Sequence, residues 1–566
     1  MLSKLPLELI ELIINKLSYD EINDIFRCNR YFSGLKHLVQ YTQPVVYDEI
    51  KHLSYSDNFI NLKYILEDTR IPDKKCKNGK IKITSLTFGE YFDNDINYIP
   101  NSVTHLDLGF NFNKKIISNY IPNSVTHLTF GYSFNQDITS TNCIPNSVTH
   151  LTFGYNFNQP INPNGGIPGS VTHLTFGYNF NQPINPNGGI PGSVTHLTFG
   201  YHFNQDINGA IPNSVTHLDF GYNFNQPILH GGIPDSVTHL DFGYNFNQLI
   251  KNGMIPNSVT HLTLSVLFND DIKEKIPKSV THLYFGTHFN QPITNNGDLP
   301  NSVTHLTFGW NFNQNITKDS IPNSITHLTF GWLFNQKITK GDIPASVKHL
   351  TFGSCFNLNI KGSLRGLNSI THLTFGKYFN QDIEDTIPDS VIYLIFGTDF
   401  NQSVTGKNRI PKSVKYIEFG SDFNQYIKKG LHKSVIHMTI GNDHLKFNIP
   451  TSVTHLSFNY YFNNNIRDMI PHTVTHLKFG YYFDQSINGH IPNSVTNLTF
   501  GHSFNQNITN CIPYSVIYLI FGYNFDKNIR DSIPNSVKRL GISKNFRNKL
   551  PISDTIKIFI IDELWD

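Results

Sequence analysis

Residues 121–138 read Ile-Pro-Asn-Ser-Val-Thr-His-Leu-Thr-Phe-Gly-Tyr-Ser-Phe-Asn-Gln-Asp-Ile, and close copies of this phrase fill most of a chain of 566 residues. The first clear copy begins at Ile99 and the last at Ile533, and most copies begin 21, 22 or 23 residues after the one before. A fixed period of this length predicts a solenoid, in which each copy forms one coil.

The middle of the phrase, Val-Thr-His-Leu-Thr-Phe, is rich in β-branched and aromatic residues and predicts a short strand. In a strand, alternate side chains share a face, so Leu128 and Phe130 point inward while His127 and Thr129 point outward. Val125 also faces inward if the chain bends just after it. Gly131 permits a turn after the strand.

One such unit cannot bury its own apolar face, whereas stacked copies can. The columns that stacking creates are those of Val125, Leu128, Phe130, Phe134 and Ile138. The expected fold is therefore a repeat solenoid, mainly β, with one parallel strand per coil about 4.8 Å from the next.

The spacing Val-x-x-Leu-x-Phe-x-x-x-Phe-Asn resembles the leucine-rich repeat, although the Asn lies two places later than in that skeleton. Phe-Asn-x-x-Ile followed by Ile-Pro resembles the FNIP repeat, a family found mainly in social amoebae and in giant viruses of amoebae. The resemblance covers residues 79–549, about 22 repeats. It implies a leucine-rich-repeat-like solenoid that binds other proteins.

Residues 1–45 do not carry the repeat. Their apolar spacing predicts three short helices, the first with Pro6 in its first turn. The string Leu-Pro-Leu-Glu-Leu at 5–9, followed by apolar pairs and by Arg27-Cys28-Asn29-Arg30-Tyr31-Phe32, resembles the F-box. That family more often has a small residue where Asn29 stands and Trp where Phe32 stands.

The F-box resemblance implies docking on a Skp1-type linker protein, which would belong to the host if the chain is viral. The residues that it places on the docking surface are Leu5, Pro6, Leu9, Ile13 and Leu17. The alternative is that these helices only cap the open core of the first repeat, as solenoids require. Residues 46–78 are expected to form a connector, and 550–566 a C-terminal capping segment with a last strand.

Composition excludes several classes of function. Lys plus Arg number 44 and Asp plus Glu 42, so the chain lacks the basic excess that nucleic-acid binding uses. Its five cysteines are scattered singly, which argues against a zinc or disulfide framework and favours a reducing compartment. We see no signal peptide and no run of 18 apolar residues, so the expected location is the cytoplasm, that of the host for a viral protein.

Sixteen of the 26 histidines fall at one position of the repeat, on the strand face opposite the core. Three interpretations are open: a row that stacks and hydrogen-bonds with its neighbours and the adjacent Thr row, a partner-binding face, or a row of metal ligands. Metal is disfavoured because ligands from one column of parallel strands do not converge tetrahedrally. Protonation of this row below about pH 6 is expected to destabilise the array.

Two further columns accompany the histidines. An aromatic residue follows the glycine in most repeats, and exposed aromatics in a row suggest a recognition surface or mere ring-on-ring packing. An Asn follows the second Phe and is expected to form a buried row that satisfies backbone groups at turns. The candidate partner-binding face comprises His105, His127, His150, His173, His196, His217, His239, His261, Tyr132, Tyr155, Trp310 and Trp332. The pattern varies most over 340–445, where determinants of a specific partner are expected.

The chain shows none of the nucleophile, phosphate-loop, zinc-protease or dinucleotide motifs, so we expect no enzyme, cofactor or metal. Two functions remain. The first is an adaptor that recruits a target to an SCF-type ubiquitin ligase, with the solenoid holding the target. The second is a repeat scaffold or binding protein whose N-terminal helices serve only as a cap.

Overall fold

The computed structural model describes residues 45–46, 62–66, 83–96, 99–139, 143–161, 166–186, 188–294, 297–427, 431–441, 449–530, 532–543, 545–546 and 556–561. The chain divides into two compact units, each with its own succession of coils. The first comprises Met1–Phe268 with Lys275–Val280, and the second comprises Asn269–Glu274 with Thr281–Asp566.

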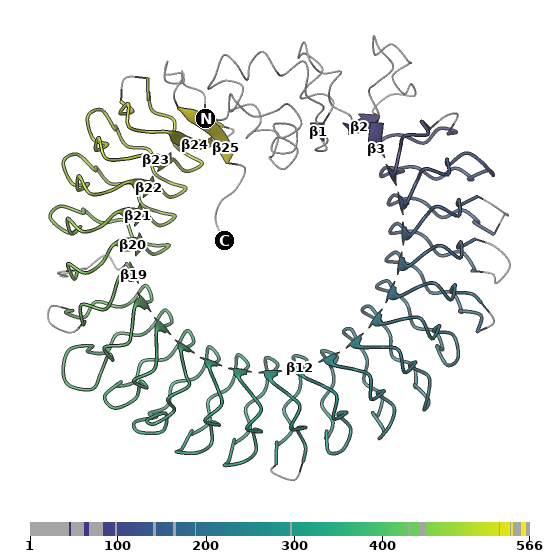
Figure 1. Cartoon of the computed structure of the whole chain (residues 1–566), viewed down its shortest axis with the longest axis horizontal. Coiled ribbons are helices and arrows are strands. Elements are labelled where there is room, and N and C mark those ends of the chain that lie inside the picture. The colour runs from purple at the N-terminus through teal and green to yellow at the C-terminus, as the bar shows by residue number, and fades with distance from the viewer. Residues whose placement is uncertain are drawn as a thin grey trace, which may run out of the picture. The chain divides into compact units, whose positions relative to one another are not determined.

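In the first unit every described strand pairs in parallel with the strand of the next coil (Figure 1). The strands are β1 (Val45–Val46), β2 (Leu62–Leu66), β3 (Ile83–Phe88), β4 (His105–Asp107), β5 (His127–Thr129), β6 (His150–Thr152), β7 (His173–Thr175), β8 (His196–Thr198), β9 (His217–Asp219), β10 (His239–Asp241) and β11 (His261–Thr263).

The second unit continues the same pattern of one parallel strand per coil. Its strands are β12 (His282–Tyr284), β13 (His305–Thr307), β14 (His327–Thr329), β15 (His349–Thr351), β16 (His372–Thr374), β17 (Tyr393–Ile395), β18 (Tyr416–Glu418), β19 (His437–Ile440), β20 (His455–Phe458), β21 (His476–Lys478), β22 (Asn497–Thr499), β23 (Tyr518–Ile520), β24 (Arg539–Ser543) and β25 (Lys557–Ile561).

Pairing is in register with the sequence repeat, so equivalent residues lie side by side. His127 pairs with His150, and Leu128 with Leu151. Most strands hold three residues, which is shorter than the six that the sequence indicated. The reason is that a turn flanks the strand on each side. The Val125 N–H donates to the Pro122 carbonyl, and the Phe134 N–H donates to the Gly131 carbonyl.

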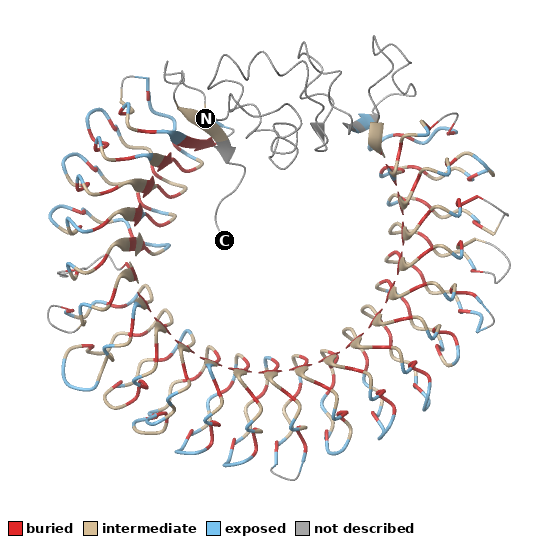
Figure 2. Cartoon of the chain, in the orientation of Figure 1, coloured by how far each residue is buried: buried red, intermediate tan, exposed pale blue. Residues whose placement is uncertain are grey.

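The core follows the predicted columns. In the repeat that opens at Ile121, the side chains of Val125, Leu128, Phe130, Phe134 and Ile138 are all at most 1% exposed. Ile121 itself is 3% exposed and begins a sixth buried column that the sequence reading did not place inward. Figure 2 shows this buried interior running through each coil between the strand side and the outer loops.

Within each unit the coils curve, with the strands on the concave side (Figure 1). The distances between stacked rings explain the direction of this curvature. From one coil to the next the imidazoles on the strand face are 4.1 Å apart at His127 and His150, whereas the core rings of Phe134 and Phe157 are 6.1 Å apart. The wider packing of the phenylalanine column, on the side away from the strands, bends the stack toward the histidines.

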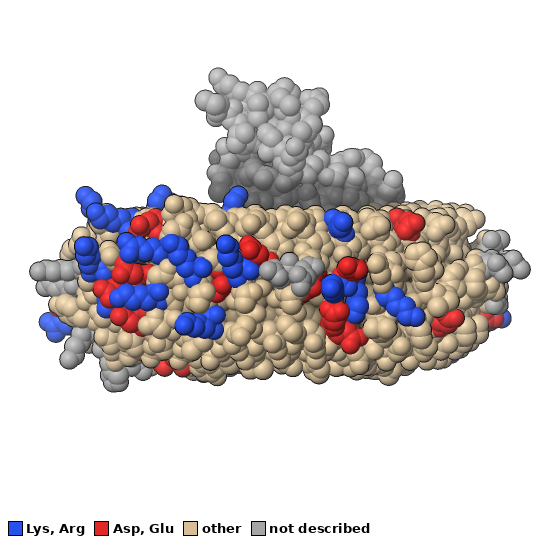
Figure 3. Space-filling model, turned by 90° about the horizontal axis from the view of Figure 1, so that it is seen from below, with Lys and Arg blue, Asp and Glu red and all other residues tan. Residues whose placement is uncertain are grey.

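The strands at the two ends of the parallel array were predicted in part. The degenerate copy at Ile81–Phe88 forms β3, and the last strand predicted at 556–561 is β25. β1 and β2, which lie at 45–66 ahead of the repeats, were not predicted as strands, yet they extend the parallel ladder from β3. The face in Figure 3 intersperses Lys and Arg with Asp and Glu, without a large area of one sign.

Candidate functional site

The histidine row lies on the concave strand face and forms a continuous stack within the first unit. Neighbouring imidazoles from His105 to His261 have centroids 4.1–4.2 Å apart and planes within 14° of parallel. The Nδ1 atom of His150 lies 2.9 Å from the hydroxyl of Thr149, the residue before it. The stacking and the contact with the Thr row, which belong to the first of the three interpretations, are therefore present in the structure.

Packing in a row lowers the pKa of His127, His150, His196, His217 and His239. Partial burial, followed by the charge of neighbouring imidazoles such as His239 and His196, lowers the pKa of His217 to about 4. The same two causes lower the pKa of His127. Parallel imidazoles in one column do not direct their nitrogen atoms toward one point. The described residues include no group of three or more His, Cys, Asp or Glu placed to hold a metal ion.

The aromatic row lies beside the histidines and also stacks. Tyr132 and Tyr155 have ring centroids 4.4 Å apart, and Trp310 and Trp332 in the second unit are 4.3 Å apart with planes only 2° from parallel. Partial burial and hydrogen bonds to neighbouring tyrosines raise the pKa of Tyr178 to about 12. The rings pack on each other yet remain accessible: Tyr132 is 39% exposed and Trp310 48% exposed.

The asparagine row forms a side-chain ladder from coil to coil. In each step the Oδ1 of one Asn accepts the backbone N–H of the next, at 2.9 Å for Asn158 and Asn181. The same Oδ1 of Asn158 also accepts from Nε2 of Gln182 at 3.1 Å. The predicted role at turns is confirmed, although these side chains are half-buried rather than buried. We call Asn113, Asn135, Asn158, Asn181, Asn204, Asn225 and Asn247 the ladder row.

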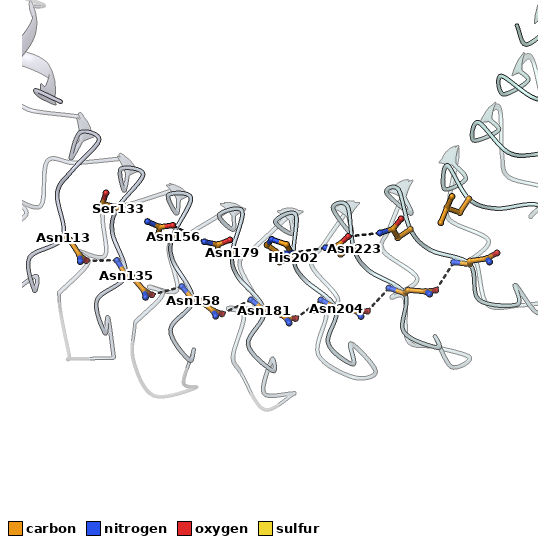
Figure 4. A pocket seen from close by; sticks show the side chains of 14 residues that line it. Asn113, Ser133, Asn135, Asn156, Asn158, Asn179, Asn181, His202, Asn204 and Asn223 are labelled. Atoms are coloured by element: carbon orange, nitrogen blue, oxygen red, sulfur yellow. Dashed lines mark hydrogen bonds between the residues drawn. The ribbon is translucent and has the colours of Figure 1, made fainter. Parts of the chain in front are cut away.

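A second polar row runs parallel to the ladder row in the first unit (Figure 4). Its members precede the buried Phe of each repeat, whereas the ladder row follows it. Asn179 donates to Oδ1 of Asn156 at 3.1 Å, and Asn245 donates to Oδ1 of Asn223 at 2.7 Å. We call Ser133, Asn156, Asn179, His202, Asn223 and Asn245 the second row.

The two rows are the walls of a groove of about 1060 Å³, which we call the amide groove. Figure 4 shows it between the strand edge and the outer loops. Apart from Leu267 its lining is polar, and it includes no Asp, Glu, Lys or Arg. The sequence analysis did not single out the position before Phe. The signal was present, since Asn occupies that position at 156, 179, 223 and 245.

The second unit keeps the ladder row but not the second row. Asn335 N–H donates to Oδ1 of Asn313, as in the first unit. The position before Phe, however, carries an amide in few coils, as at Asn311 and Asn524, and Leu333, Cys355 and Tyr378 follow Asn311 in successive coils. The fold therefore requires the ladder row in both units and tolerates loss of the second row.

The variable stretch at 340–445 carries ion pairs between neighbouring loops instead. Lys361 pairs with Glu384 at 2.7 Å, Arg365 with Asp385 at 3.4 Å, and Arg409 with Asp382. A pocket of about 230 Å³ adjoins them, lined in part by Arg365, Asp385 and Asp389. In each pair at least one side chain is 48% exposed or more, so solvent screens the attraction and each pair contributes little to stability.

The structure thus brings the predicted histidines and aromatics of the first unit into continuous rows, whereas in the second unit residues such as Ser354 and Lys377 interrupt the aromatic row. The expected docking residues Leu5, Pro6, Leu9, Ile13 and Leu17 lie outside the described residues, so the N-terminal helices remain a prediction. In the part of the chain that the structure describes, we find no helix with the length and apolar character needed to cross a bilayer.

A family model and a curated relative both relate this chain to FNIP repeat proteins. The family model described as FNIP Repeat matches fourteen segments, which begin with 112–156 and end with 504–545. An FNIP repeat-containing protein of Acanthamoeba polyphaga mimivirus is 32% identical over 132 residues, which are 20% of this chain and 32% of that protein. The match thus spans about a third of that curated relative.

Among solved structures, the protein titled CroV588, a novel circular LRR protein, is similar over 90% of this chain and 73% of its own. Its sequence is 41% identical, and the TM-score is 0.60. The expected leucine-rich-repeat-like fold is confirmed by this likeness.

Proposed function

Because the chain belongs to the FNIP repeat family, a group of repeat solenoids whose fold is typical of binding proteins, we propose that it is a non-enzymatic adaptor. In this proposal the solenoid holds a target protein, and residues 1–45 connect that target to an SCF-type ubiquitin ligase. The chain would then act by bringing two proteins together, without chemistry of its own.

The observation that carries the binding role is the exposed aromatic row. Phe110, Tyr132 and Trp310 are 47%, 39% and 48% exposed, although each belongs to a stacked column. Aromatic side chains are enriched at protein interfaces, because they offer large contact areas at low cost in conformational entropy. Rings that are held in place by their neighbours lose even less freedom when a partner covers them.

The ligase connection is supported by the F-box resemblance at Leu5, Pro6, Leu9, Ile13 and Leu17. One structural feature favours docking over a purely capping role. β2 pairs with β3 and β1 pairs with β2, so the edge of the first repeat strand is occupied by residues 62–66. Helices at 1–45 are then not required to cover that edge and are free to bind a linker protein.

Co-purification of the full chain with a Skp1-type protein tests the adaptor role. The matched variant combines Leu5→Asp with Pro6→Ala, which removes apolar docking surface and leaves the repeats untouched. Capture by the parent chain and loss in the variant is the expected result. Absence of capture by a folded parent chain would contradict the ligase connection and leave a binding scaffold with N-terminal helices as a cap.

A further inference from the structure

We propose that the amide groove of the first unit is a binding site for an extended, uncharged segment of polypeptide, held through its main chain. The inference rests on the proposed function, in that it assigns a kind of target to the solenoid. It differs in placing the contact on the flank of the coils, between strand edge and outer loops, and not on the concave row of histidines (Figure 4).

The ladder row leaves a line of unused donors. The Oδ1 atoms of Asn135, Asn158 and Asn181 are occupied by the next coil's backbone N–H and Gln side chain. Among the described residues, no protein acceptor is found for the Nδ2 groups of these three side chains. A half-buried amide N–H is better satisfied by a hydrogen bond than left unpaired. The ladder row therefore calls for a ligand with regularly spaced acceptors.

The second row offers the complementary groups. Nδ2 of Asn179 and of Asn245 is used within the row, whereas their Oδ1 atoms have no donor among the described residues. An extended peptide directs carbonyls and N–H groups to both of its edges in alternation. Its carbonyls can thus accept from the ladder row while its N–H groups donate to the second row.

The dimensions agree with a peptide. The buried Phe column, whose members stand between the two rows in sequence, advances 5.9–6.2 Å per coil. Carbonyls on one edge of an extended chain recur every two residues, about 6.4–6.8 Å, and less in a twisted strand. The mismatch of about 0.5 Å per step lets some three or four consecutive coils stay within hydrogen-bond range. The whole groove is long enough for roughly 11 extended residues at about 3.3 Å each.

Two features of the site favour an uncharged polypeptide over other ligands. The lining has no Asp, Glu, Lys or Arg, so a charged segment would lose hydration without gaining a partner. The neighbouring tyrosines stack face to face, at 4.2 Å for Tyr155 and Tyr178. Their ring faces are covered and cannot receive a sugar ring, which favours a polypeptide over a neutral glycan.

The second row is not needed for folding, which points to a role outside it. In the second unit Leu333 occupies the equivalent position, 39% exposed, and its coil keeps the same strand and ladder bonds. In the second unit few coils have an amide at this position, as at Asn311 and Asn524, whereas in the first unit four of five successive coils carry one, at 156, 179, 223 and 245. This run of amides converts the ladder into a two-walled groove.

Substitutions already present in other repeats allow a test that preserves the fold. Asp484 stands in the asparagine row of the second unit and accepts from Asn505 N–H at 2.8 Å. Asn158→Asp with Asn204→Asp should therefore keep the ladder while removing two Nδ2 donors. Asn156→Leu with Asn179→Leu removes the opposite wall and copies Leu333. The matched control is Asn335→Asp with Asn311→Leu in the second unit.

The probe is a phage-displayed library of 12-residue peptides built only from uncharged residues, selected on the full chain. A peptide recovered from it is labelled and measured by fluorescence anisotropy. We expect binding to the parent chain and to the second-unit control, and a loss of about tenfold or more in each first-unit variant. Circular dichroism melts should show all four chains folded.

Equal affinity of the peptide for parent and first-unit variants would overturn the inference, as would failure to recover any peptide. Displacement of the peptide by neutral oligosaccharides such as cellohexaose at equal affinity would reassign the groove to glycans. The Leu5→Asp, Pro6→Ala chain should still bind the peptide. Loss of linker capture and loss of groove binding are thus separate results, and either proposal can fail alone.

Discussion

The imidazole of His327 lies flat against that of His349, with ring centroids 4.2 Å apart and planes 19° from parallel. Partial burial, followed by the charges of His305, His349, Lys348 and His282, lowers the pKa of His327 to about 4. Since a histidine in an unfolded chain titrates near 6.5, the unfolded chain binds more protons than the folded one between about pH 6.5 and 4. The free energy of unfolding should therefore fall as the pH is lowered through this range.

The prediction is a melting temperature several degrees lower at pH 5 than at pH 7.5. Buried carboxyls oppose the trend, since burial and then the charge of Asp219 raise the pKa of Asp241 to about 6. They are few against the ten histidines of the row whose pKa is lowered. Replacing His327 and His349 by Tyr, which occupies this row at Tyr393 and Tyr416 with a 4.1 Å stack, should reduce the pH dependence. Equal melting temperatures at both pH values would contradict the expectation.

The asparagine ladder should discriminate between two substitutions of one residue. Oδ1 of Asn181 accepts the N–H of Asn204 at 2.9 Å and Nε2 of Gln205 at 3.0 Å. Asn181→Ala leaves that backbone N–H without its acceptor and should cost about 1–3 kcal/mol. Asn181→Asp keeps the acceptor and should stay close to the parent. Urea unfolding compares the two, and similar losses for both would exclude the ladder as the cause.

Glycine at the end of the strand is required by the approach of neighbouring coils. A Cβ on Gly154 would overlap the carbonyl oxygen of Gly131, whereas a Cβ on Gly192 would meet nothing within 4 Å. Gly154→Ala should therefore be strongly destabilising, since the backbone cannot yield. Gly192→Ala should be neutral or stabilising by a few tenths of a kcal/mol, because it restricts the unfolded chain. Thermal melts of the two variants side by side test the contrast.

The core should respond differently from the exposed aromatic row. Phe180 is fully buried and lies 4.0 Å from Phe176 between ring centroids, so Phe180→Ala should cost about 3–5 kcal/mol. Tyr132 is 39% exposed, so Tyr132→Ala should cost far less stability. If Tyr132→Ala weakens target capture while leaving the melting temperature nearly unchanged, the aromatic row acts in binding. Unchanged capture would remove Tyr132 from the proposed surface.

The period of the sequence repeat and the alternation of inward and outward side chains in each strand were enough to predict the parallel coils, the core columns from Val125 to Ile138 and the stacked histidines. They were not enough to place Ile121, because Ile-Pro reads as a bend and its burial depends on how the coil closes. The amide groove also escaped prediction. Asn156 and Asn158 face one groove only because the intervening Phe157 is buried, and that follows from the turn after Gly154, not from strand alternation.

The stacked histidine rings lie closer together than the phenylalanine rings of the core, and this difference has a mechanical consequence. Imidazoles 4.1 Å apart at His127 and His150 are already near the closest separation that carbon atoms tolerate, about 3.5–4.0 Å. Each unit can therefore hardly be wound tighter, because its inner rings would collide. Opening it would part the stacked faces and also stretch the hydrogen bonds between parallel strands, such as β5 and β6, which lie on the same concave side. The coils of a unit should thus resist a change of curvature in both directions and behave as a stiff arc.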